Sequence, residues 1–416
     1  MKKEKKVRLE LVLIFYLIAC NMLQILMIDA KGSLYDSIWK ACILVFTIFS
    51  CVYISLKYKL KLNKNNTLIW LIFTMLTTIS NICNGCLLAN FSFNNFVTYI
   101  YPIISFFIFA VVFGNISFDE ECLKNFLNYF IIFITYTCIF NMIYNYSSII
   151  NFINIKNSNE VQISSFFDNR NTFALYLLYG ILSNIIIITY YKNKNKIYLF
   201  TLLLFALNAF LTLSRTNILC IAIFIFTLYL TSKDMRKNRK ITLLICCGIL
   251  VIICIPQFRN FISHNLIRKE AKLSNREVIW KYGINLYREN ELTGIGMNNA
   301  LNKLKDLSQY TSFHNTYLSI LLDGGIVSAI GYMILFIYDL KKIIMIKKYN
   351  SELFRIFIAI FIVYTVNGIT ETNILFQTSA TSFLCTTFVF ILPVYITSFY
   401  YRKREERNYI NENQKN

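Results

Sequence analysis

No polar stretch in this sequence is long enough to form a water-soluble catalytic domain. The 416 residues also contain no internal repeat and no low-complexity linker, and they include only three prolines, twelve glycines and two histidines. These absences predict a single domain in which any active site is built from the ends of helices and the loops that connect them.

Metal and cofactor signatures are missing as well. The twelve cysteines lie mostly in apolar stretches, as Cys246, Cys247 and Cys254 do, and no spacing typical of a disulfide or a metal site is visible. Residues 294–298, GIGMN, lack the preceding strand and the third glycine of a dinucleotide-binding fingerprint, so they indicate a turn. We therefore expect neither a metal ion nor an organic cofactor.

Apolar residues make up 56% of the chain, which exceeds what a soluble globular domain carries. A bilayer core about 30 Å thick needs about 20 apolar residues per helix, and such stretches recur from residue 9 to residue 400. The sequence predicts an all-α, polytopic membrane protein with about twelve transmembrane helices. The expected spans are 9–30, 38–56, 67–88, 96–113, 125–144, 172–190, 197–213, 216–231, 241–256, 315–339, 353–370 and 376–400.

We expect one transmembrane domain over residues 1–400, an extracytoplasmic loop at 257–314 between spans nine and ten, and a basic cytoplasmic tail at 401–416. A formal charge of +20 would suggest nucleic acid as the partner of a soluble protein. Here the basic residues lie mostly in alternate short connectors, so the charge indicates topology, and we expect no nucleic-acid partner. Both termini are then cytoplasmic. The inner connector 114–124 fits this pattern least well, because it has a single lysine.

Three short segments carry polar residues on the expected outer side. Arg215 lies at the tip of a hairpin inside the apolar run 197–231, where a charge must sit at the interface or in a polar cavity. FDNRN contains Arg170 and Asn171, and TETN contains Glu371, the best carboxylate on that face. For these two segments a plain solvated connector is an equal alternative, and for Arg215 the alternative is a topology anchor.

The loop 257–314 is basic, although it lies on the side where basic residues are scarce. Arg276, Trp280 and Ile284 indicate an amphipathic helix at the membrane interface, with the tryptophan as its anchor. Arg276 and Arg288 are candidates to bind the phosphates of an anionic lipid-linked substrate, because guanidinium groups bind phosphate through paired hydrogen bonds. A face that binds lipid headgroups is the alternative.

The segment at residues 312–326, SFHNTYLSILLDGGI, points most directly to chemistry. Ser312 is the expected N-cap of the tenth span, which puts His314 and Asn315 in its first turn, beside backbone N–H groups that attract a phosphate. Histidine is the side chain best suited to move protons near neutral pH, although a histidine satisfied by loop carbonyls is the alternative. Asp323 lies about 14 Å deeper by helix rise, and we expect it to be a buried structural partner.

Four segments follow one another between residues 166 and 336: FFDNRNTFALYLL, TLSRTNILCIAIF, REVIWKYGINLYRENELTGIGMNN and FHNTYLSILLDGGIVSAIGYMILF. In their order, spacing and common side of the membrane they resemble the O-antigen ligase-like superfamily, which includes Wzy-type polysaccharide polymerases. The chain departs from the family pattern at Arg170, where proline is common, and at Asp323, where glutamate is common.

The resemblance implies a glycosyltransferase of the bacterial cytoplasmic membrane that joins oligosaccharide repeats carried on undecaprenyl diphosphate at the outer face. It implies a metal-independent, inverting displacement in which His314 activates the acceptor hydroxyl as a base, with Glu371 in reserve. Arginines would bind the diphosphate in place of a metal. The implied partners are the lipid-linked substrate and the bilayer, together with a flippase and a chain-length regulator. The diphosphate-binding residues would be Arg170, Arg215, Arg276 and Arg288, and the supporting residues Asn171, Asn315 and Asp323.

Three other functions fit parts of the sequence. A ligase of the same superfamily would transfer a finished chain to another acceptor, and the lack of a soluble glycan-binding domain favours the polymerase. A flippase for the same repeats also has about twelve spans, but it would carry its basic residues at mid-membrane depth and would not need so long a polar loop. A membrane acyltransferase also uses a histidine, but its acyl donor comes from the cytoplasm, and His314 is expected on the opposite side.

Overall fold

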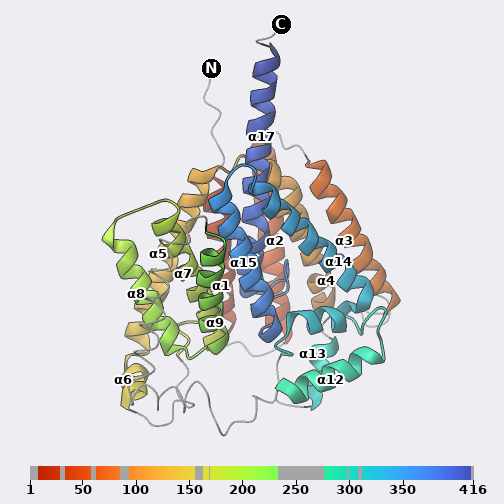
Figure 1. The fold of residues 1–416 in the computed structure, drawn as a ribbon. Coiled ribbons are helices and arrows are strands. Elements are labelled where there is room, and N and C mark those ends of the chain that lie inside the picture. Colours follow the sequence, from red (N-terminus) through yellow and green to blue (C-terminus); the bar gives the residue numbers. More distant parts are fainter. Residues whose placement is uncertain are drawn as a thin grey trace. The chain divides into compact units, whose positions relative to one another are not determined.

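The computed structural model consists of helices, and no strand occurs among the residues that it describes (Figure 1). Those residues are 8–28, 33–57, 62–84, 93–154, 163–167, 169–232, 276–297, 299–307 and 312–413. They separate into two compact units, and two helices, α5 (Glu120–Tyr144) and α15 (Ser351–Thr370), contribute residues to both. The expectation of an all-α fold is confirmed.

The first unit comprises Met1–Phe126, Arg276–Phe357 and Gly368–Asn416. Within it, α14 (Thr316–Ile346) packs against α3 (Lys64–Cys83), α17 (Leu392–Asn413), α12 (Arg276–Arg288) and α13 (Asn299–Leu307). Aromatic rings fill its interior, where Phe73 packs edge-to-face on Tyr332 and Phe106 stacks on Phe376. Lipid tails are as apolar as these rings, so close packing of this kind supplies much of the attraction between membrane helices. The other described helices of the first unit, besides parts of α5 and α15, are α1 (Leu9–Ile28), α2 (Ser33–Lys57), α4 (Phe93–Phe106), η1 (Phe107–Val112), η2 (Phe113–Asn115), α16 (Ala380–Thr386) and η4 (Thr387–Ile391).

The second unit comprises Leu127–Asn275 and Ile358–Asn367. Its described helices, besides parts of α5 and α15, are α6 (Tyr146–Asn154), α7 (Arg170–Thr189), α8 (Lys196–Leu211) and α9 (Arg215–Leu230). Most side chains of α7 are buried, because α7 packs against both α8 and α9. Asparagine side chains link helices in this interior, as Asn141 Nδ2 donates to Asn208 Oδ1 at 2.8 Å. The short link between α8 and α9 confirms the predicted hairpin.

Six helices in the described part of the chain are long and apolar enough to cross a membrane. They are α3, α5, α7, α14, α15 and the continuous helix that runs from α16 into α17, and each corresponds to a predicted span. Five shorter apolar helices match five further predictions, namely Leu9–Asn21, Ala41–Leu56, Phe96–Val112, Lys196–Leu211 and Arg215–Leu230. The remaining predicted span, 241–256, lies outside the described residues, as does much of the predicted loop 257–314. The total of twelve spans therefore stays a prediction.

Candidate functional site

His314 lies in the short segment that leads into α14. Its backbone is in the left-handed region, at φ 48°, and its N–H donates to Ser312 Oγ at 3.1 Å. The helix begins at Thr316 and its N-cap is Asn315, whose Oδ1 accepts from Leu318 N at 2.9 Å. The prediction that Ser312 caps the helix is wrong, because Ser312 instead fixes the bend at His314. His314 therefore precedes the first turn and does not lie within it.

The link that follows α15 is held against the start of α14 by hydrogen bonds. Thr372 Oγ1 accepts from Asn315 N at 3.2 Å. Thr316 Oγ1 donates to Glu371 O at 2.8 Å and accepts from Asn373 N at 2.9 Å. Because these bonds fix both backbone segments, the side chain of Glu371 is placed beside the segment that carries the histidine. Neither threonine was predicted as a site residue, and nothing in their local sequence distinguishes them.

The carboxylate of Glu371 contacts both a histidine and an arginine. Its Oε2 lies 3.5 Å from His314 Nδ1, at the outer limit of a hydrogen bond, and its Oε1 accepts from Arg276 Nη2 at 3.2 Å. Glu371 is the most enclosed of the three, with 14% of its side chain exposed against 23% for Arg276 and 34% for His314. A carboxylate beside Nδ1 favours the tautomer protonated there, which leaves Nε2 as a proton acceptor. These three residues are called the Glu371 cluster below.

The helix α12 brings Arg276 to this cluster. A Cβ on Gly283 would lie 3.0 Å from Phe313 Cε1 and 3.0 Å from Leu318 Cδ2, so α12 approaches the start of α14 as closely as a glycine allows. Trp280 is half-buried, and its Nε1 donates to Phe313 O at 2.9 Å. The predicted helix is confirmed, and Trp280 attaches it to the residue before His314. The role of Trp280 as an anchor at the membrane interface stays a prediction.

Arg288 lies at the other end of α12. It follows Arg276 by twelve residues, or about 18 Å along the helix axis, and its side chain is exposed. The structure therefore does not bring Arg288 to the Glu371 cluster.

The turn that follows α12 fills a break in α14. Gly325 has φ 61° and ψ −163°, a conformation almost restricted to glycine, and it interrupts the helix. Gly296 N donates to Asp323 O at 3.1 Å, and Ile326 N donates to Glu291 O at 2.8 Å, so the turn supplies the hydrogen bonds that the break removes. The predicted turn is confirmed for residues 294–297. The break was not predicted, although the paired glycines in DGGI are its sequence signal.

We expect Gly325→Ala to destabilise the protein by more than about 2 kcal/mol. A Cβ at this position would lie 2.3 Å from Leu292 O, and alanine disfavours the backbone conformation. Gly331→Ala is the matched control on the same helix, because a Cβ there would meet its nearest atoms at 3.6 Å. Thermal unfolding in detergent, followed by tryptophan fluorescence, measures both variants. Equal unfolding temperatures would contradict the tight junction between the turn and α14.

Three further predicted site residues, Arg170, Asn171 and Arg215, lie in the second unit, whereas Asp323 lies in the first. Arg170 is the first residue of α7, whose N-cap Asn169 accepts from Thr172 N at 2.8 Å, and Asn171 follows it. Arg215 is exposed and is the first residue of α9. Each arginine thus stands at a helix N-terminus, where the helix dipole favours anions.

The model of the O-antigen ligase family matches residues 200–333, about a third of the chain. A comparison with curated proteins gives no match. The matched region contains Arg215, Arg276, His314 and Asp323, and it ends before Glu371. Together with the apolar helices, which indicate a multi-pass membrane protein, this match supports placing the chain in the O-antigen ligase-like superfamily.

Proposed function

We propose that this protein polymerises oligosaccharide repeats carried on undecaprenyl diphosphate, by metal-independent, inverting glycosyl transfer at the outer face of the bacterial cytoplasmic membrane. The Glu371 cluster carries the proposal, because it joins a base, a carboxylate that orients the base and a phosphate-binding cation at the start of α14. Two of its members lie in the region that matches the O-antigen ligase family. A ligase of the same superfamily is the alternative.

In the proposed reaction, a hydroxyl oxygen of the acceptor sugar attacks the anomeric carbon of the donor. The bond from that carbon to the diphosphate oxygen breaks, and its electron pair leaves with the diphosphate. His314 Nε2 accepts the hydroxyl proton, and the resulting imidazolium is stabilised by Glu371 beside Nδ1. The imidazolium then releases the proton to solvent. A single displacement of this kind inverts the configuration of the anomeric carbon.

The departing diphosphate needs positive charge around it. Arg276 contacts Glu371 through Nη2, and a guanidinium has further N–H donors that can bind a phosphate oxygen. We propose Arg170 and Arg215 as further phosphate ligands, because each begins a helix. For Arg288 the same role rests on the sequence alone.

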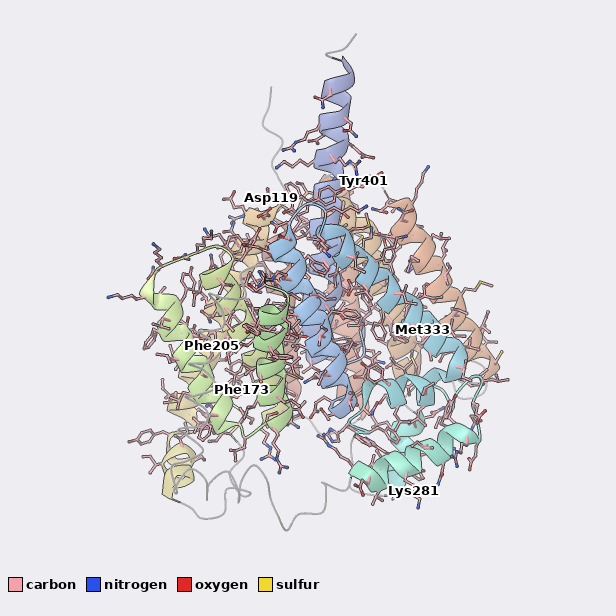
Figure 2. The ribbon with its side chains drawn as sticks, viewed as in Figure 1. Asp119, Phe173, Phe205, Lys281, Met333 and Tyr401 are labelled. Carbon is pink, nitrogen blue, oxygen red and sulfur yellow. The ribbon has the colours of Figure 1, made fainter. Side chains whose placement is uncertain are left out.

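Arg276→Ala is expected to lower polymer output by about 100-fold or more, the usual cost of removing one group that stabilises transition-state charge. Lys281→Ala is the matched control, since it removes an equal charge from an exposed position on the same helix (Figure 2). Each variant would complement a deletion strain, and the ladder of surface polysaccharide on a gel would be compared at equal protein levels in the membrane. Equal ladders from both variants would contradict the role of Arg276.

The deletion strain also tests the class of reaction. We expect single repeats to accumulate on undecaprenyl diphosphate at the outer face, because export continues while chain extension stops. Finished chains that remain on undecaprenyl diphosphate would indicate a ligase, and repeats retained on the cytoplasmic side would indicate a flippase. Either result would contradict the polymerase.

A further inference from the structure

The guanidinium of Arg276 has two anionic partners to serve, one seen in the structure and one implied by the reaction. In the structure its Nη2 donates to Glu371 Oε1 at 3.2 Å. Under the proposed function, on which this inference rests, the same guanidinium binds the diphosphate of the substrate. A carboxylate and a diphosphate on one guanidinium lie close together, and two anions at such a range repel each other. This repulsion opposes the binding of both anions at once.

The contact between Arg276 and Glu371 is of a kind that a stronger anion displaces. Nη2 makes one hydrogen bond to the carboxylate, whereas the strongest contacts between a guanidinium and a carboxylate have two parallel bonds. The side chain of Arg276 is 23% exposed, so both water and a substrate can reach it. Partly exposed ion pairs are weak, because water screens the two charges. A diphosphate carries more negative charge and more acceptor oxygens than a carboxylate, so it is the stronger partner.

Of the two side chains, that of Arg276 is the one able to change its partner. The backbone of Glu371 is fixed, because its carbonyl oxygen accepts from Thr316 Oγ1 at 2.8 Å. The helix that carries Arg276 is also fixed one turn further on, where Trp280 Nε1 donates to Phe313 O at 2.9 Å. Between these two fixed backbones, the guanidinium ends a long side chain with several rotatable bonds. It can therefore turn from the carboxylate to a substrate without a movement of either segment.

We propose that Glu371 and the substrate diphosphate exchange Arg276 in each catalytic cycle. Before the donor binds, Glu371 holds the guanidinium. The diphosphate then draws Arg276 away, which increases the negative charge that the carboxylate presents to His314 Nδ1 when the imidazolium forms. After transfer the carboxylate binds Arg276 again, and this competition helps undecaprenyl diphosphate to leave. Glu371 is thus the counterion of the empty site as well as the residue that orients the base.

Binding of geranyl diphosphate to the purified protein in detergent tests the exchange. This ligand has a diphosphate and a prenyl chain but no sugar, so no glycosyl transfer occurs. Isothermal titration calorimetry would compare the wild type, Glu371→Gln, Arg276→Ala and the combined variant. We expect Glu371→Gln to bind about two- to five-fold more tightly than the wild type, because the ligand no longer displaces a partly exposed ion pair. The combined variant should bind no more tightly than Arg276→Ala, because the exchange needs the arginine.

Two further variants support this comparison. Glu277→Gln removes an equal charge from the exposed residue next to Arg276, and it should change the affinity less than Glu371→Gln does. Glu371→Asp, which draws the carboxylate back but keeps its charge, serves if the Glu371→Gln protein does not fold, and it should also bind more tightly than the wild type.

Four results would overturn the exchange. Equal gains from Glu371→Gln with and without Arg276, or an equal gain from Glu277→Gln, would mean that the carboxylate acts only through its charge. Weaker binding by Glu371→Gln, or by Glu371→Asp in its place, would mean that Glu371 holds Arg276 in position for the phosphate. A wild type that does not bind the ligand would remove Arg276 as a diphosphate ligand. Because the assay requires no glycosyl transfer, the exchange can fail while the polymerase stands.

Discussion

His314→Ala is expected to abolish chain extension while the protein stays in the membrane at its normal level. Without the imidazole, no base accepts the proton of the acceptor hydroxyl. A positioned base accelerates such a reaction by a factor of about 10²–10⁴. His314→Asn is the second variant, because asparagine tolerates the left-handed backbone at φ 48° but does not titrate. The gel ladder of surface polysaccharide measures both.

The other histidine of the chain provides the control for this experiment. His264→Ala removes the same side chain from a position that we assign no role, so it should keep the full ladder. Long chains made by both His314 variants at normal protein levels would exclude His314 as the base.

Glu371→Gln is expected to lower the rate of glycosyl transfer by a factor of about 10²–10⁴ when it is the only substitution. In a protein that already carries His314→Ala, the same substitution should lower the rate little further. The glutamine keeps the shape of the side chain but removes the charge that stabilises an imidazolium at Nδ1. The measurement is the rate of undecaprenyl diphosphate release by the two single variants and by Glu371→Gln combined with His314→Ala.

This double-mutant comparison separates two roles for the carboxylate. If Glu371 orients His314, the two losses overlap, and the double variant resembles His314→Ala alone. If Glu371 were an independent base, the losses would multiply. Unchanged transfer in the Glu371→Gln protein would remove the carboxylate from the mechanism altogether.

The helices of this protein could be predicted from the sequence because apolar runs of membrane length identify them directly. The entry to α14 was placed within a few residues, and the hairpin before Arg215 was placed correctly. The cap of α14 was not, because Ser312 and Asn315 both suit the position and contacts with Thr372 and Ile369 select the asparagine. Tertiary contacts decided between two residues of equal local preference.

The contacts within the site could not be predicted, because they join residues far apart in the chain. His314 and Glu371 are 57 positions apart, and the sequence suggested each one separately as a base. Their contact depends on threonine hydrogen bonds that have no local signature. Arg276 and Arg288 were predicted together as phosphate ligands, but the length of α12 separates them.

Reconstitution of the purified protein in liposomes with single lipid-linked repeats tests the proposed polymerase most directly. The substrate would be extracted from the deletion strain, and the reaction would be followed by the length of the glycan and by the release of undecaprenyl diphosphate. We predict longer chains, with one undecaprenyl diphosphate released for each glycosidic bond, and neither product from the His314→Ala protein. Repeats that cross the bilayer without growing, or chains that grow equally in the wild type and the variant, would contradict the account.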